Sequence, residues 1–172
     1  LARTAKLAYA APPLLNAKLE QGGLDAVLTY WNYAATLEVA GFRPLVTVSD
    51  CAETLGLPPH PPLIGYVFHG RWAAAHRPLI DGFLAASSQA EAILVHSDAE
   101  WNAVRPLMRA PSEKLFLRLR DRFREGVVHV DPTAEERTAD RLFAIIHAEG
   151  GSAATGGLDR MPSGVFWGSS GA

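Results

Sequence analysis

The chain has 172 residues, enough for one domain with a sizeable core, and its apolar content of 48% is typical of a soluble globular protein. A formal net charge of −2 argues against a broad electrostatic surface for nucleic acid, and a single cysteine excludes an internal disulfide and a cysteine-rich metal site. No uninterrupted apolar run approaches the roughly 20 residues that span a bilayer, so the sequence predicts a protein that is not membrane-embedded.

The start of the chain predicts a strand followed by a helix. Apolar residues between positions 3 and 10 indicate a strand, and Pro12 and Pro13 can end it and occupy the first turn of a helix. Residues at helical spacing follow as far as Leu19, and Gly22 suits the end of that helix. Because the sequence opens with neither an initiator methionine nor a signal peptide, we expect an N-terminal part of the protein to be missing.

The stretch GGLDAVLTYWNYAATLEVAG, from Gly22 to Gly41, predicts a strand, a corner and a helix. Leu24–Thr29 is a short apolar run of the kind found in strands buried in a parallel sheet, and the helix would run from residue 32 to its capping glycine. Pro44–Val48 predicts a second strand. The two strands and the intervening helix would form a right-handed βαβ unit.

Tyr30, Trp31, Asn32 and Tyr33 occupy the predicted corner between strand and helix. In open α/β sheets, ligands bind at the carboxyl ends of strands, where aromatic faces supply apolar contact and free N–H groups at a helix start favour an anion. The alternative is that these rings are ordinary core aromatics, as most aromatics at element boundaries are. The corner is therefore a candidate ligand site with a purely structural rival interpretation.

Three motifs lie in this region: small-x-Leu-Asp-Ala from Gly22, Trp-x-Tyr-x-Ala-x-Leu from Trp31, and Gly-x-x-x-Leu from Gly41. Together they resemble the solute-binding proteins of nitrate, sulfonate, taurine and thiamine-pyrimidine importers, over about residues 5–126. The resemblance implies an α/β fold of the type II periplasmic-binding-protein kind: a mostly parallel sheet flanked by helices, followed by a helical C-terminal part. Whole members of this family carry a first lobe ahead of the region matched here.

The same resemblance implies a function and a location. The chain would be the periplasmic substrate-binding component of an ABC-type importer, would need no cofactor, and would deliver a small solute to permease and ATPase subunits. Residues 1–62 would belong to the second lobe, and residues 63–172 would carry a return strand and a helical part of the first lobe. Tyr30, Trp31 and Asn32 would bind the solute, and Pro12 and Pro13 would shape the opposite wall of the cleft.

The second half of the chain predicts mainly helices. The exceptions are Leu63–His69, which indicates a strand, and Val165–Trp167, which could form an edge strand. Trp101 is at helical spacing from other apolar residues and is expected in the core, whereas the four arginines between 118 and 124 are expected on a solvated helix face. Helices are predicted over Pro78–Val95, after the caps Ser97 and Ser112, and after Asp131-Pro132.

Two other functions stay open from the sequence. Pyrimidine-precursor synthases, which resemble the same superfamily and act on their own active-site histidine, would need a histidine in the cleft, and His69 is the one plausible candidate. Ligand-sensing domains of some transcription regulators also resemble this fold. The chain has no HExxH, Gly-x-Ser-x-Gly or P-loop motif, and Cys51 with His60 lacks a third partner, so the sequence predicts a binder and not an enzyme.

Overall fold

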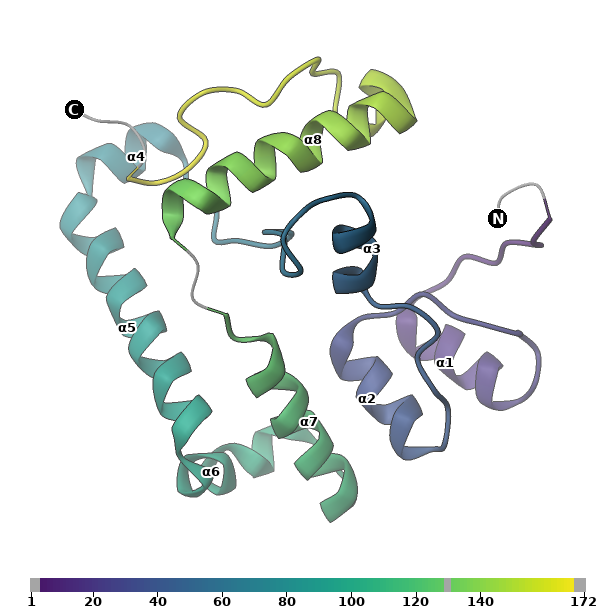
Figure 1. The fold of residues 1–172 in the computed structure, drawn as a ribbon. Coiled ribbons are helices and arrows are strands. Elements are labelled where there is room, and N and C mark those ends of the chain that lie inside the picture. Colours follow the sequence, from purple (N-terminus) through teal and green to yellow (C-terminus); the bar gives the residue numbers. More distant parts are fainter. Residues whose placement is uncertain (1–3, 129–130, 169–172) are drawn as a thin grey trace. The chain divides into compact units, whose positions relative to one another are not determined.

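The computed structural model describes residues 4–128 and 131–168. Within these ranges the chain forms eight α-helices and no β-strand (Figure 1). The helices are α1 (Pro12–Glu20), α2 (Trp31–Val39), α3 (Val48–Thr54), α4 (Gly70–Ala75), α5 (Arg77–His96), α6 (Asp98–Met108), α7 (Glu113–Gly126) and α8 (Pro132–Ala154).

The predicted α/β fold with a mostly parallel sheet is therefore wrong. Residues 4–10, Leu24–Thr29, Leu63–His69 and Val165–Trp167 are irregular, and Val48 begins α3; residue 3 lies outside the described residues. Buried strands would hide their apolar side chains, yet Leu28, Ile64 and Val67 are 93%, 90% and 93% exposed. The physical reason is that a strand is stable only when a neighbour pairs with its backbone, and apolar composition cannot supply that neighbour.

The helices predicted from capping residues are confirmed. Ser97 Oγ accepts a hydrogen bond from Glu100 N at 3.2 Å, and Ser112 Oγ accepts one from Leu115 N at 3.2 Å. The Asp131 carboxylate accepts one from Ala134 N at 3.0 Å. Each bond satisfies one of the four N–H groups that a helix start leaves unpaired, which fixes where α6, α7 and α8 begin.

Helix ends also follow from glycine. Gly41 has φ +97°, its N–H donates to Glu38 O, and Phe42 N–H donates to Leu37 O, which is the Schellman arrangement that closes α2. Gly151 has φ +65° and breaks the helical path within α8. Two helices were not fully predicted, α3 and α4; α3 begins with a capping box between Thr47 and Asp50.

The chain divides into two compact units. Unit 1 comprises Leu1–Pro44 and Leu84–Val127, and unit 2 comprises Leu45–Phe83 and Val128–Ala172, so α5 contributes its first turns to unit 2 and its remainder to unit 1. The predicted lobes, residues 1–62 and 63–172, stay a prediction.

In unit 1, helix α7 packs against α2 and α6, and α2 packs against α1 (Figure 1). Trp101 is 4% exposed, its Nε1 donates to Leu94 O at 2.5 Å, and its ring meets the Phe123 ring edge-on with 5.3 Å between centroids. The prediction that Trp101 belongs to the core is confirmed. Leu37, Leu115 and Phe116 are buried in the same unit.

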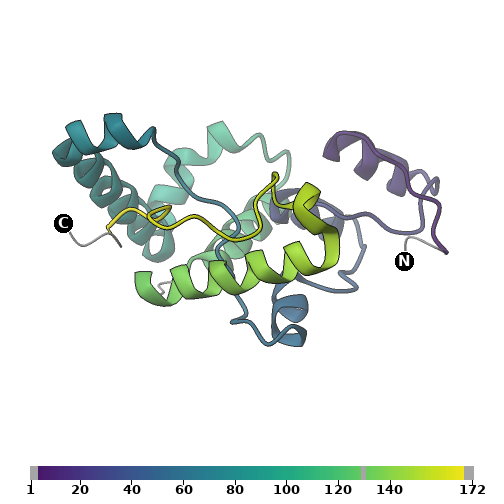
Figure 2. The same ribbon diagram turned by 90° about the horizontal axis from the view of Figure 1, so that it is seen from above.

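In unit 2, the chain after α8 turns back along that helix towards α4 and the start of α5 (Figure 2). Trp167 ends this segment: its Nε1 donates to Asp81 Oδ1 at 3.0 Å, and the Arg77 guanidinium lies 4.8 Å from its ring centroid. The predicted edge strand is thus replaced by a side-chain contact with α5. Phe83 meets the rings of Tyr66 and Phe68 edge-on, at 4.8 and 6.2 Å between centroids.

Candidate functional site

The predicted corner residues lie at the start of α2. Tyr30 is the residue before the helix, with extended backbone angles (φ −83°, ψ 160°), and Trp31 and Asn32 are its first two residues. No described side chain caps this helix start, so N–H groups of its first turn are available to a ligand. The helix start is where the sequence predicts it, although no strand leads into it.

Two of the three aromatic side chains of this corner are open to solvent, and the third, Tyr33, is half-buried. Tyr30 is 62% exposed and Trp31 is 51% exposed, and Asn32 is exposed as well. Trp31 touches Phe123 of α7 edge-on, with ring centroids 6.4 Å apart, so one edge of the ring is anchored in unit 1 while half of its surface stays free. An exposed, partly anchored ring at an uncapped helix start can stack on a flat solute.

Pro12 and Pro13 begin α1, as the sequence predicts for a helix start. Their link to the corner is Asn16, one turn further along α1, whose Nδ2 donates to Tyr33 O in α2 at 3.2 Å. Asn16 lies at i+4 and i+3 from the two prolines and so shares their face of α1. We call the following residues the α1–α2 junction: Pro12, Pro13, Asn16, Thr29, Tyr30, Trp31 and Asn32.

Two residues of the junction were missed from the sequence. Asn16 is only 6% exposed, and its Oδ1 has no hydrogen-bond partner; the covered hydroxyl of Thr29 has none either. These are the two covered side-chain atoms without a partner in the part of the chain that the structure describes. One feature of the sequence could have identified Asn16: it lies between Leu15 and Leu19 on a predicted helix. A polar residue among apolar ones is costly to bury without a hydrogen-bond partner, so its position calls for an explanation.

The four arginines of α7 do not form the solvated face that the sequence predicts. Their spacing makes two i,i+4 pairs, and each pair holds one carboxylate of another helix. Arg118 Nε donates to Glu38 Oε2 at 2.6 Å, and Arg122 also donates to both oxygens of Glu38. On α6, Asp98 Oδ1 accepts from Arg120 Nη1 at 3.3 Å and from Arg124 Nη2 at 2.8 Å.

A shallow groove of about 250 Å³ lies beside the Glu38 pairs, between α2 and α7. Its polar groups already have partners: Lys114 Nζ donates to Val39 O at 3.2 Å, and Arg118 Nε donates to Glu38. We therefore assign this groove to the packing of α2 on α7. It is lined by Glu38, Val39, Lys114, Leu117, Arg118 and Asp121.

The Glu38 carboxyl should make the stability of unit 1 depend on pH. Burial alone would raise its pKa, but hydrogen bonds and charge from Arg122 and Arg118 outweigh burial and lower the pKa below the ordinary value of 4.5. A lowered folded-state pKa means that Glu38 stabilises the fold fully above about pH 4.5 and loses this effect as the pH falls through the folded-state value.

We expect the melting temperature to fall as the pH drops from 6 to 3, and to fall less in Glu38→Gln, which has no carboxyl to protonate. Circular dichroism melts of both proteins across this range test the prediction. Parallel curves for the two proteins would show that Glu38 contributes nothing to the acid sensitivity.

His69 and Cys51, the residues considered for an enzymatic function, both lie at the surface. His69 is an exposed residue that precedes α4, and Cys51 is exposed on α3. Among residues 4–128 and 131–168, no group of three or more His, Cys, Asp and Glu side chains could hold a metal ion.

None of the described helices combines the length and the apolar character needed to cross a membrane. Comparison of the sequence with models of protein families finds no match, and comparison with curated proteins finds none either.

Proposed function

We propose that this chain is the solute-binding component of an ABC-type importer, and that it takes a small solute at the α1–α2 junction. The solute would be nitrate, a sulfonate, taurine or a pyrimidine-like compound, the delivery partners would be permease and ATPase subunits, and the location would be the periplasm. The motifs between Gly22 and Leu45 support this proposal. Because residues 4–128 and 131–168 form no α/β fold, the proposal covers capture of the solute and not closure of two α/β lobes.

The observation that carries the proposal is the half-open ring of Trp31 beside the uncapped start of α2. A flat solute can stack on the free part of the ring while its oxygen atoms accept hydrogen bonds from the first N–H groups of the helix. The Asn32 amide, exposed beside the ring, can add a directed hydrogen bond. Apolar contact and polar donors are thus combined at one place, as small-molecule sites require.

A thermal-shift screen of the full chain tests the proposal, with nitrate, methanesulfonate, taurine and uracil as probes. A probe that binds only the folded state should raise the melting temperature in proportion to the logarithm of its concentration. Trp31→Ala should then weaken binding of the active probe by about tenfold, or ~1.4 kcal/mol.

Trp72→Ala is the matched control, because Trp72 is 43% exposed and lies on α4 of unit 2, outside the junction. It should leave the affinity unchanged. If Trp31→Ala binds the probe as well as the unmodified chain does, the proposed site is wrong.

A further inference from the structure

We propose that two copies of this chain associate by exchanging their C-terminal segments, residues 155–168, so that Trp167 of each copy docks on Arg77 and Asp81 of the other. The proposal goes beyond solute binding, because it concerns unit 2 and not the α1–α2 junction. It starts from the contact that Trp167 makes within one chain, which shows what the first turns of α5 recognise.

The first turns of α5 carry two groups that together recognise an indole ring. Asp81 Oδ1 accepts a hydrogen bond from Trp167 Nε1 at 3.0 Å, and the Arg77 guanidinium carbon lies 4.8 Å from the ring centroid. Arg77 and Asp81 are four residues apart and therefore share one face of α5. An indole nitrogen can only donate, a carboxylate can only accept, and a guanidinium is attracted to an aromatic face. The pair thus selects tryptophan over phenylalanine, which has no N–H donor.

The C-terminal segment is fixed at its start and irregular along its length. Gly157 N donates to Ser152 O at 2.7 Å, and Thr155 Oγ1 lies 3.2 Å from His147 Nδ1, so the turn after α8 is held in place. Residues 155–168 form neither helix nor strand, and residues 162–165 are all exposed. We call residues 159–166 the linker; extended, it can span roughly 26 Å. It can direct Trp167 to its own α5 or to that of a neighbouring copy without breaking a helix.

The contact of Trp167 with α5 is chemically the same within one chain and between two, so what the linkers add decides between the two arrangements. In an exchanged pair the two linkers cross from one copy to the other and run past each other. Leu158 and Val165, at the two ends of this stretch, are 44% and 57% exposed in the single chain. The passing linkers can cover these apolar side chains, which the contact within one chain leaves open to solvent.

The charges of the linker suit a second copy of the same linker. Asp159 and Arg160 are adjacent, exposed and opposite in charge. An exchange of identical segments follows two-fold symmetry, which makes the two linkers antiparallel. When the axis passes between these two residues, Asp159 of each copy lies opposite Arg160 of the other. The linker is therefore complementary in charge to its own copy, which favours this register over others.

Analytical ultracentrifugation of the full chain tests the exchange. We expect the unmodified chain to form dimers whose fraction rises with concentration. Trp167→Ala removes the ring and keeps the site on α5, whereas Arg77→Ala combined with Asp81→Ala removes the site and keeps the ring. Each of these variants alone should associate at least about tenfold more weakly than the unmodified chain. An equimolar mixture of the two should recover dimers, because the ring of one variant can dock on the intact α5 of the other.

Trp72→Ala is the matched control, since Trp72 is 43% exposed on α4 of the same unit. Mixed with the α5 double variant, it should recover no dimers beyond those that it forms alone, because its own Trp167 already occupies its α5. Trp167→Phe keeps a ring without the N–H donor and replaces Trp167→Ala in the mixture if the alanine variant does not fold.

Two results would overturn the exchange. An unmodified chain that stays monomeric at every concentration would show that Trp167 docks only within its own chain. A mixture that dimerises no more than its separate components would show that any association uses another surface. Neither result bears on solute binding, because Trp167, Arg77 and Asp81 lie in unit 2 and the α1–α2 junction lies in unit 1.

Discussion

Trp101→Ala is expected to lower the free energy of unfolding by about 3–5 kcal/mol, the range for deleting a buried aromatic side chain. The ring is 4% exposed and packs edge-on against Phe123, so its removal leaves a cavity where α6 meets α7. It also removes the indole donor from Leu94 O, which keeps the hydrogen bond that Arg124 Nε donates at 3.2 Å.

Urea unfolding followed by circular dichroism measures this effect, with Trp72→Ala as the control. Trp72 is 43% exposed, so its removal should cost far less than that of Trp101. If the two variants unfold at the same urea concentration, Trp101 is not a core residue. We expect Trp101→Ala to lower stability more than affinity for the solute. We expect Trp31→Ala to lower affinity more than stability.

Glu38→Ala is expected to cost about 2–3 kcal/mol of unfolding free energy, somewhat below the figure for breaking a fully buried ion pair. The Glu38 side chain is 13% exposed and is held by Arg118 and Arg122, whose side chains are 32% and 25% exposed. Removal of the carboxylate leaves two partly buried cations facing α2. Glu125, which already contacts both arginines, compensates in part.

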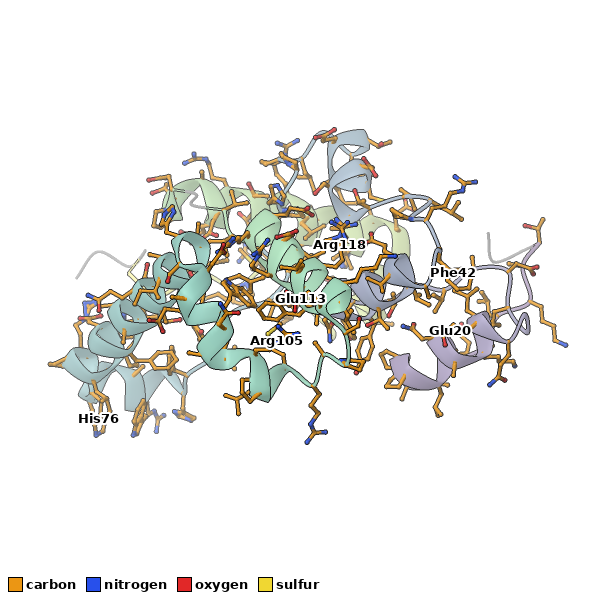
Figure 3. The ribbon with its side chains drawn as sticks, turned by 90° about the horizontal axis from the view of Figure 1, so that it is seen from below. Glu20, Phe42, His76, Arg105, Glu113 and Arg118 are labelled. Carbon is orange, nitrogen blue, oxygen red and sulfur yellow. The ribbon has the colours of Figure 1, made fainter. Side chains whose placement is uncertain are left out.

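The matched control is Glu113→Ala. Glu113 and Arg105 are labelled in Figure 3 and pair at 2.5 Å. The Glu113 side chain is 60% exposed, so the loss should be at most about 1 kcal/mol. Chemical unfolding of both variants at pH 7 gives the comparison. A Glu38 variant no less stable than the Glu113 variant would show that the arginine pairs of α7 do not hold α2.

The partners of the α7 arginines could not be predicted from the sequence. At 100° per residue, arginines two positions apart spread around the helix, and such arginines can face solvent or two different neighbours. Whether they face solvent or neighbours depends on whether carboxylates of segments distant in sequence lie within hydrogen-bonding distance of them. The carboxylates of Glu38 and Asp98 do so. The sequence of residues 113–126 alone does not predict these contacts.

The sequence by itself determined the starts of α6, α7 and α8 and the end of α2, because caps and glycine stops act within a few residues of one another. Ser97, Ser112, Asp131 and Gly41 are examples in which a local hydrogen bond or a positive φ sets the boundary. The start of α2 has no side-chain cap, yet the sequence predicted it to within one residue.

Only the tertiary structure decided which apolar segments become strands and which polar atoms find partners. Leu24–Thr29 and Leu63–His69 have strand-like composition, but a strand requires a paired neighbour, and neither segment has one among the described residues of its unit. The sequence around Asn16 does not show that this residue is buried, because the contact with Tyr33 of α2 that accompanies its burial is with a different helix. Pairing and burial are relations between segments far apart in the chain, so they arise only when those segments pack.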